Sequence, residues 1–221
     1  MRLDWDWDFA IEIFPSLAAA LRVTVLATVL GSCVALTLGL LLAIARRSSL
    51  GFLSLAAGSF IEFVRSTPLL IQIYFLFYVM PRFGLRLSPM ATGVLALGVH
   101  YSSYVAEVYR AGIEAVPRGQ WEAAAALSLG RTRTFFRIVL PQAIPPIVPS
   151  LGNYVVAMFK ETPLLSTITV LELLYTAKDI GSETFRYLEP FTLIGVLFLV
   201  VSLMAMAGIR FVERRLPAYA S

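Results

Sequence analysis

Two adjacent charged residues, Lys160 and Glu161, lie within a long uncharged part of the chain. The uncharged run before them begins at Ile138, and residues 162–171 after them also carry no charge. A zwitterionic ligand requires one cationic and one anionic partner, with polar groups to replace the water it loses. Since adjacent helical residues point about 100° apart, the two side chains are predicted not to pair simply with each other. The candidate polar groups that complete such a site are Asn153, Thr162, His100 and Tyr101.

A structural interpretation of the same residues stays open. In that interpretation, Lys160 extends its ammonium group to the edge of an apolar layer, and Glu161 faces water there. His100 is then a histidine whose ring satisfies structural hydrogen bonds on an otherwise apolar helix.

Two further charged pairs have the spacing of neighbours on a helix. Glu62 and Arg65 are three residues apart, and so are Glu107 and Arg110. This spacing places each pair on one helical face. The pairs are interpreted either as structural ion pairs or as parts of a gate in which the pairs break and re-form.

Residue sets typical of catalytic or metal sites are absent from the sequence. The chain has one histidine and one cysteine, Cys33, which excludes an intrachain disulfide and a metal cluster built from cysteine. Cys33 is expected to be a small buried hydrophobe. Neither a Gly-x-x-x-x-Gly-Lys-Ser/Thr phosphate loop nor a His-Glu-x-x-His motif occurs. The polar residues therefore point to binding rather than to chemistry.

The elements that position these residues are predicted to be transmembrane helices. Of the 221 residues, 58% are hydrophobic and only 14% are charged, whereas soluble domains carry about 25% charged residues. Lipid leaves only helices or closed barrels, and the uninterrupted apolar runs lack the alternation of barrel strands. We therefore expect an all-α membrane protein with about five spans, at residues 21–45, 50–80, 87–106, 142–159 and 190–209.

The second run is too long to be one straight span. As a single helix, residues 50–80 would extend for about 46 Å, whereas the hydrocarbon core is ~30 Å thick. We expect a bend at Pro68, with the first part of the run at the cytoplasmic edge. Gln72, four residues further on, is expected to hydrogen-bond backbone groups that the proline frees.

Arginine placement predicts the orientation, because cytoplasmic loops are enriched in arginine and lysine. With five spans, ten arginines fall on one side: Arg46, Arg47, Arg110, Arg118, Arg131, Arg133, Arg137, Arg210, Arg214 and Arg215. The other side has fewer cations and the acidic N-terminal segment. The N-terminus is therefore predicted to be outside and the C-terminus inside.

The long polar connection at residues 111–142 is predicted to be cytoplasmic and to form two short helices. Residues 121–129 are rich in alanine, a strong helix former, and Trp121, Ala125 and Leu129 recur at four-residue spacing. A second amphipathic piece follows before a group of prolines. The two pieces are interpreted either as a knob that docks into a groove on a partner or as a helical hairpin lying on lipid.

This loop resembles the signature loop of ABC importer permeases. The similarity rests on "EAA" at residues 122–124, followed by Ile138, Leu140 and Pro141. Three further stretches resemble the polar amino acid uptake family: "EFVRSTPLLIQIYFLFY" from Glu62, "YVAEVYRAGIEAVPRGQWEAA" from Tyr104 and "FKETPLL" from Phe159. The stretch "KDIGSETFRYLEPF" from Lys178 resembles the ectoine and hydroxyectoine permeases. The resemblance covers residues 11–215.

The resemblance implies that the loop forms coupling helices which dock on an ATPase subunit. The residues for which the resemblance implies this coupling role are Glu122, Ala123, Ala124, Ala125, Ser128, Leu129 and Gly130. The family usually has glycine at the position of Ser128, as a hinge. Because serine tolerates the left-handed conformation poorly, the turn is predicted to shift by two residues, toward Gly130, or to be tighter. Pro163 replaces a common serine of the family and predicts a helix break.

The chain is thus expected to be one transmembrane permease domain, residues 1–221, in the bacterial inner membrane. The resemblance implies that it pairs with itself or with a sister permease to form a path for a polar amino acid or an ectoine-like compatible solute. Because the chain has no phosphate loop, ATP and Mg²⁺ are expected on a separate dimer of ATPase subunits. A solute-binding protein outside would deliver the solute. Neither a cofactor on this chain nor a nucleic-acid partner is expected.

The sequence disfavours two other classes of function. A self-contained channel or secondary carrier is disfavoured by the amphipathic cytoplasmic loop, which has no nucleotide site of its own. A membrane-embedded enzyme is disfavoured because the sequence lacks a catalytic set.

Overall fold

The computed structural model describes residues 4–216, and every regular element within this range is helical. The α-helices are α1 (Trp7–Arg46), α2 (Gly51–Arg65), α3 (Leu69–Tyr74), α4 (Pro89–Glu114), α5 (Arg118–Ala126), α6 (Arg131–Thr134), α7 (Leu140–Glu161), α8 (Leu173–Thr184) and α9 (Leu188–Arg215). Short π-helical segments, Phe75–Val79 and Phe135–Val139, follow α3 and α6. Two 3-10 segments, Met80–Phe83 and Thr162–Ile168, lie before α4 and after α7. The prediction of an all-α chain is confirmed for the described residues.

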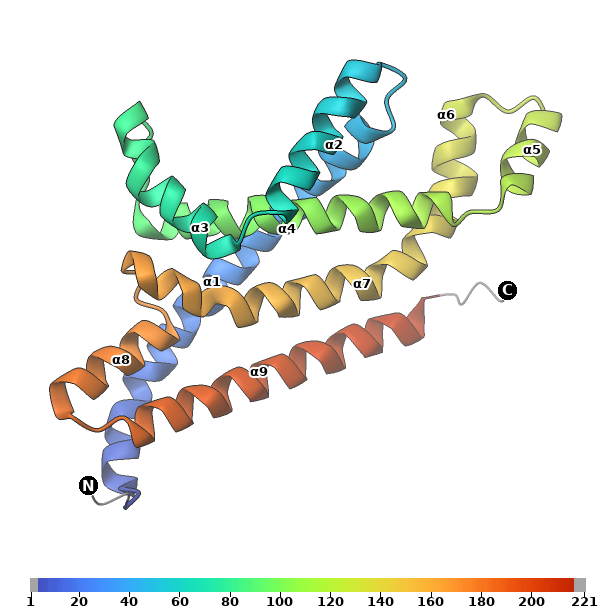
Figure 1. Ribbon diagram of the computed structural model, residues 1–221. Coiled ribbons are helices and arrows are strands. Elements are labelled where there is room, and N and C mark those ends of the chain that lie inside the picture. Colours follow the sequence, from blue (N-terminus) through green and yellow to red (C-terminus); the bar gives the residue numbers. More distant parts are fainter. Residues whose placement is uncertain (1–3, 217–221) are drawn as a thin grey trace.

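The long helices are arranged so that sequence-distant segments share each end of the molecule (Figure 1). Helices α4, α7 and α9 run alongside one another, with α7 in contact with both of the others, while α1 crosses them and packs mainly on α4. The short helices α5 and α6 project beyond the C-terminal end of α4, on the side where α9 ends. Helix α8 and the start of α9 lie near the N-terminus at the opposite end.

Small residues allow α1 and α4 to approach closely. The buried face of α1 includes Ala27, Gly31, Ala35 and Gly39. On α4, a Cβ atom added to Gly98 would lie 2.4 Å from Cγ1 of Val34, which is closer than carbon atoms can pack. Close backbone approach through small residues is the usual basis of helix association in lipid. This contact fixes α4, which carries most of the polar residues of interest.

Fewer helices qualify as membrane spans by length and hydropathy than the five spans predicted from the sequence. Two helices, α1 and α9, are long and apolar enough to cross a membrane, and the count rises to four if each of two bent helix pairs forms one span. The third predicted span, residues 87–106, lies in α4, which is long enough but does not meet this criterion because polar groups such as His100 and Ser102 lower its hydropathy. Five spans with the N-terminus outside therefore stay a prediction.

The predicted bend at Pro68 is confirmed. Helix α2 ends at Arg65 and α3 begins at Leu69. The chain direction changes by 104° between Gly51–Arg65 and the helical segment Leu69–Phe83. The side-chain amide of Gln72 donates hydrogen bonds to the carbonyl oxygens of Val64 (2.8 Å) and Thr67 (3.1 Å). The amide thus satisfies backbone acceptors that the interrupted helix leaves without partners. The expected role of Gln72 is confirmed.

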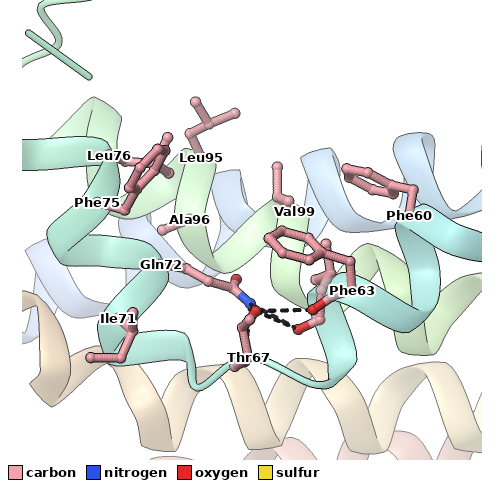
Figure 2. Close-up of a pocket in the computed structure, with 11 residues that line it drawn as sticks. Phe60, Phe63, Thr67, Ile71, Gln72, Phe75, Leu76, Leu95, Ala96 and Val99 are labelled. Atoms are coloured by element: carbon pink, nitrogen blue, oxygen red, sulfur yellow. Dashed lines mark hydrogen bonds between the residues drawn. The ribbon is translucent and has the colours of Figure 1, made fainter. Parts of the chain in front are cut away.

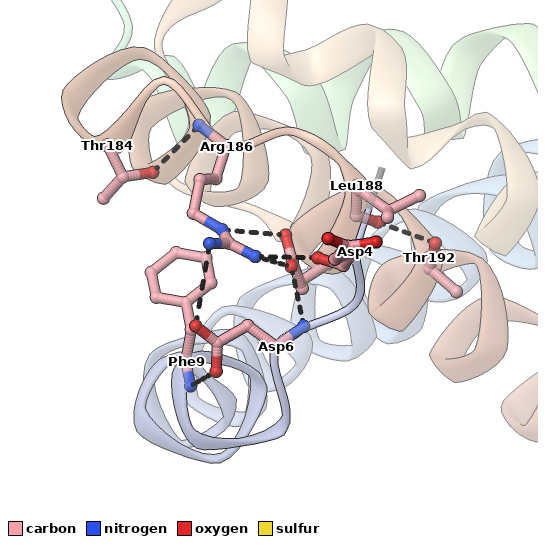
Figure 3. Close-up of polar contacts among 8 residues, drawn as sticks. Asp4, Asp6, Phe9, Thr184, Arg186, Leu188 and Thr192 are labelled. Atoms are coloured by element: carbon pink, nitrogen blue, oxygen red, sulfur yellow. Dashed lines mark hydrogen bonds and ion pairs between the residues drawn. The ribbon is translucent and has the colours of Figure 1, made fainter. Parts of the chain in front are cut away.

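A polar clamp joins the start of α1 to the start of α9 (Figure 3). Asp6 caps α1 by accepting a hydrogen bond from the backbone N–H of Phe9, and its own N–H donates to Glu189. The guanidinium of Arg186 pairs with the buried carboxylate of Glu189 and with Asp6. The hydrogen bond from Arg186 to Glu189 raises the pKa of this guanidinium, which keeps it charged. The clamp explains why α1 begins at Trp7, well before the predicted start of the first span.

Candidate functional site

Side chains of α4 and α7 meet in a cluster of one carboxylate and four rings. The hydroxyl of Tyr101 donates a hydrogen bond of 2.9 Å to Oε2 of Glu161. The ring centroids of His100, Tyr104 and Tyr154 lie 5.6, 6.2 and 6.2 Å from that of Tyr101. The rings of Tyr104 and Tyr154 are 5.6 Å apart. We call these five residues the aromatic–carboxylate cluster.

Helical spacing explains how the cluster forms. Tyr104 lies four residues after His100 and three after Tyr101, so α4 presents all three rings on neighbouring positions of one face. Tyr154 and Glu161 are seven residues apart, or about two turns of α7, and so share a face of that helix. Glu161 is the last residue of α7, which ends there because Pro163 follows in a 3-10 segment. The predicted helix break is confirmed.

The cluster has the chemical character of a site for a small organic cation. A carboxylate supplies the opposite charge, and the faces of aromatic rings attract cations within about 6 Å. Three tyrosine hydroxyls offer hydrogen bonds that replace lost water. The ammonium group of a zwitterion fits these groups.

The structure brings together only part of the predicted ligand set. His100, Tyr101 and Glu161 belong to the cluster, whereas Lys160 and Asn153 are exposed. Lys160 has no ion-pair partner within residues 4–216. The hydroxyl of Thr162 is buried and donates to the carbonyl oxygen of Phe159 at 2.7 Å, so it closes the end of α7.

Three members of this region were missed or only partly identified from the sequence. Tyr104 and Tyr154 were not proposed as site residues, although the spacing of Tyr104 from His100 was a usable signal. Gln72 was assigned a backbone role alone, but its Oε1 also lies 3.3 Å from Nδ1 of His100. The amide therefore connects the bend at Pro68 to the cluster.

The two predicted charged pairs differ in the structure. Arg110 pairs with Glu107 at 2.7 Å and also with Glu114 at 2.5 Å. Glu62 and Arg65, in contrast, do not form an ion pair. The guanidinium of Arg65 lies 5.3 Å from the ring centroid of Tyr104 instead.

A separate cavity of about 290 Å³ lies between α2, α3 and α4 (Figure 2). Its lining includes Phe60, Phe63, Ile71 and Phe75, and the hydrogen bonds of Gln72 lie at its edge. The cavity contains no charged side chain. It is therefore unsuited to a zwitterion, which would lose its hydration without compensation.

The loop predicted to couple to an ATPase forms a helical hairpin of α5 and α6. Glu122, Ala123, Ala125, Ser128 and Gly130 are exposed on it. Leu129 is half-buried, and Trp121 packs against the buried cluster of Val116, Val139 and Ala143. Ala124 is buried, with 1% of its surface exposed, so it supports the hairpin from within. The exposed apolar residue Leu127 was not predicted.

The expected shift of the hairpin turn toward Gly130 is wrong. Ser128 itself adopts the left-handed conformation, with φ of 53°, whereas Gly130 has φ of −62°. The N–H groups of Leu129 and Ser128 donate to the carbonyl oxygens of Ala124 and Ala125. These two bonds form a Schellman cap, in which the residue after the C-cap takes the left-handed conformation. The two backbone hydrogen bonds outweigh the cost to serine.

Two features of the described part of the chain concern metal ligation and the position of its cysteine. Within residues 4–216, no group of three or more His, Cys, Asp or Glu side chains is arranged to hold a metal ion. Cys33 is a free thiol and is exposed on α1. The expectation that Cys33 is buried is wrong, because it lies on the face of α1 opposite Ala35 and Gly39.

Comparisons with known proteins identify close relatives over the full length. A probable amino-acid ABC transporter permease protein of Sinorhizobium fredii (strain NBRC 101917 / NGR234) is 46% identical over 224 residues, which cover 98% of this chain and 97% of the relative. The L-cystine transport system permease protein TcyB of Bacillus subtilis (strain 168) is 32% identical over 219 residues, with 96% and 92% covered. A solved structure described as an amino acid ABC transporter with histidines matches with a TM-score of 0.92 at 35% identity, covering 97% of this chain and 100% of that one.

The family model described as "binding-protein-dependent transport system inner membrane component" matches residues 35–217. This match covers the α4–α7 cluster and the α5–α6 hairpin together. The family implies a complex with an ATPase and a binding protein. The chain therefore belongs to the family of binding-protein-dependent transport system inner membrane components, and it is the multi-pass permease subunit of an ABC importer rather than an ATPase.

Proposed function

We propose that this permease carries a small zwitterionic amino acid through the inner membrane and that the aromatic–carboxylate cluster binds it on the way. The observation that carries the proposal is the hydrogen bond between Tyr101 and Glu161, within a group of aromatic rings. The ammonium group of the solute would displace the Tyr101 hydroxyl from Glu161 and lie against the ring faces. The printed names of relatives, which include an amino-acid and an L-cystine permease, support this substrate class.

The carboxylate of the solute requires a cation, and Lys160 is the candidate. It follows Phe159 in the "FKETPLL" stretch and is exposed without an ion-pair partner within residues 4–216. A site built from Lys160 and Glu161 reads both charges of a zwitterion and rejects simple ions. Asn153, within α7, and Thr162, directly after it, stay in the proposal as polar groups.

An ectoine-like solute is the competing substrate. The stretch from Lys178 that resembles the ectoine permeases contains Arg186 and Glu189, and both are occupied in the clamp with Asp6. These residues therefore have a structural reason to be present. For this reason we propose an amino acid and use ectoine as the competitor in the test.

We further propose the assembly in which the cluster works. Two permease protomers, identical or sister chains, enclose the path, and a dimer of ATPase subunits docks on the exposed face of the α5–α6 hairpin. An extracytoplasmic binding protein delivers the solute. The charged exterior of the hairpin, with Glu122, Arg131 and Arg133, supports a protein partner.

The experiment measures uptake of radiolabelled L-glutamine, L-cystine, L-arginine and ectoine by the complex reconstituted with its ATPase and binding protein. Lys160→Met and Glu161→Gln each remove one charge with little change in volume. Losing one charge-assisted hydrogen bond costs roughly 1.5–3 kcal/mol, or about 10- to 150-fold in affinity. We expect both variants to abolish amino-acid uptake while assembly and basal ATP hydrolysis stay intact.

Lys178→Met is the matched control, because Lys178 is exposed on α8 and is not a member of the cluster. It should leave uptake unchanged. Unchanged uptake kinetics in a properly assembled Lys160→Met complex would show that this lysine only extends to the membrane surface. If the complex takes up ectoine in preference to all three amino acids, the proposed substrate class is wrong and an ectoine-like solute takes its place.

A further inference from the structure

A second, strongly polar cavity lies outside the aromatic–carboxylate cluster. Its volume is about 490 Å³, and it is bounded by the end of α1, by α2 and by the C-terminal part of α4. Four arginines line it: Arg46, Arg47, Arg65 and Arg110. The volume falls within the ~300–1,000 Å³ of small-molecule sites.

Some of these charges are already satisfied within the protein. Arg110 is held by two carboxylates, those of Glu107 and Glu114. Arg46 donates to the backbone and side-chain oxygens of Ser54 at 3.3 and 3.4 Å. These groups form a fixed wall of the cavity rather than a binding surface.

Glu62 and Arg65 remain available to a ligand. They are three residues apart on α2, a spacing at which opposite charges commonly pair, yet no ion pair joins them, and neither has an ion-pair partner elsewhere in residues 4–216. Both side chains are exposed and line the cavity. The cavity thus presents one carboxylate, that of Glu62, and two guanidiniums, those of Arg65 and Arg47, that have neither an ion pair nor a hydrogen bond within residues 4–216. Glu62 and Arg65 lie a single helical turn apart on α2, a spacing that matches the ammonium and carboxylate groups of an amino acid.

Arg65 also connects this cavity to the aromatic–carboxylate cluster. Its guanidinium lies over the ring of Tyr104, 5.3 Å from the centroid. Tyr104 in turn contacts His100, Tyr101 and Tyr154. A solute that leaves the cluster along α4 therefore meets Arg65 next.

We propose that this cavity is a second solute site on the release side of the permease, in which Arg65 binds the carboxylate of the amino acid and Glu62 its ammonium group. The inference rests on the proposed function and on the predicted orientation, which places this end of α2 and α4 in the cytoplasm. Arginine suits the carboxylate because its planar fork donates two parallel hydrogen bonds. The released solute can rebind from the cytoplasm, so accumulated amino acid slows further uptake.

The first measurement is equilibrium binding of radiolabelled L-glutamine, L-cystine and L-arginine, each in turn, to the permease–ATPase complex in nanodiscs. For the amino acid that binds, we expect two sites per protomer. Glu62→Gln should remove one site and Glu161→Gln the other. The variant Glu62→Asp, which keeps the carboxylate, should retain the second site with reduced affinity.

The second measurement is uptake into proteoliposomes preloaded with the same amino acid. Glu62→Gln should raise the internal concentration needed for half-inhibition at least tenfold while the external KM stays unchanged. Glu183→Gln makes the same chemical change on exposed α8 and should alter neither quantity.

The outcomes separate this inference from the proposed function. One site per protomer, lost in Glu161→Gln and kept in Glu62→Gln, would overturn the release site and leave the proposed function standing. Binding that survives Glu161→Gln but is lost in Glu62→Gln would overturn the proposed function instead. If Arg65→Gln changes only the dependence of ATP hydrolysis on phosphatidylglycerol in the nanodisc, the cavity binds a lipid phosphate and the inference fails.

Discussion

At the scale of single residues, the backbone conformation at Ser128 decides the shape of the α5–α6 hairpin. A residue with a side chain in the left-handed conformation costs roughly 1 kcal/mol relative to glycine. The Schellman bonds from Ser128 and Leu129 hold the residue there nonetheless. The hairpin therefore contains local strain that a single substitution can remove.

We predict that Ser128→Gly stabilises the chain against thermal unfolding by about 1 kcal/mol. Gly130→Ser is the control. Gly130 has φ of −62° and ψ of 148° at the N-cap of α6, where serine is a favoured residue, so no loss of stability is expected. Differential scanning fluorimetry of the purified protein in detergent measures both. A lower melting temperature for Gly130→Ser, with no gain for Ser128→Gly, would place the left-handed residue at Gly130.

At the scale of helices, the contact between α1 and α4 depends on the absence of a side chain at Gly98. We predict that Gly98→Ala destabilises the protein by about 1–3 kcal/mol, because the new methyl group would overlap Val34. The control is Gly195→Ala on α9, where a Cβ atom meets nothing within 4 Å. Alanine favours helix by up to about 1 kcal/mol over glycine, so the control should be neutral or more stable. Equal melting temperatures for the two variants would contradict the packing described.

The α5–α6 hairpin is the second element whose role can be tested directly. Ala125 is exposed on α5, so Ala125→Asp is expected to insert and fold normally. A charge buried without a partner at the ATPase contact costs a few kcal/mol, and the variant should lose the ATPase subunit or its stimulated hydrolysis. Co-purification and ATP hydrolysis measure the two effects.

Ser182→Asp adds the same charge on exposed α8, at the other end of the molecule. It should leave co-purification and hydrolysis unchanged. Full transport by a correctly inserted Ala125→Asp complex would exclude the hairpin as the coupling contact.

At the scale of the whole molecule, orientation in the membrane is the property with most consequences for the proposals. Arginine asymmetry predicts that the N-terminus and the connection at residues 80–88 face outward and that residues 111–142 face inward. The fold agrees in one respect, since the α5–α6 hairpin and the end of α9 lie on the same side and the N-terminal clamp lies opposite (Figure 1). Helix α4 connects these two sides, but its hydropathy is below the level typical of a spanning helix, so its crossing of the membrane stays a prediction.

Single cysteines introduced into a Cys33→Ala background test the predicted topology. The Cys33→Ala substitution is needed because Cys33 is exposed and would itself be labelled. An impermeant maleimide added to intact cells should label Arg86→Cys and should label Ser128→Cys only after the cells are opened. Labelling of Ser128→Cys from outside would reverse the orientation and remove the basis for a release site beside Glu62 and Arg65.

The sequence by itself determined the class of the protein, the approximate helices and the bend at Pro68. The lengths of the apolar runs, the positions of the prolines and the order of the motifs are local features of the sequence. Hydropathy and helix geometry are enough to predict helices and bends from such features. The same local reasoning proposed His100, Tyr101 and Glu161 as members of one site, and these three side chains lie together in the structure. It also assigned Gln72 to the backbone at the bend. It also correctly ended α7 before Pro163.

Only the tertiary structure decided which of these groups meet. Tyr154 joins the cluster because α7 packs beside α4, and Arg65 leaves Glu62 for the ring of Tyr104 because α2 lies against the same helix. Sequence spacing predicts which residues are neighbours on one helix, but it does not predict which face of another helix they contact. It therefore predicted the pair Glu62–Arg65 and missed Tyr154. The turn at Ser128 differs from these cases, because it is fixed locally. Backbone hydrogen bonds to Ala124 and Ala125 at the end of α5 stabilise a conformation that serine alone disfavours.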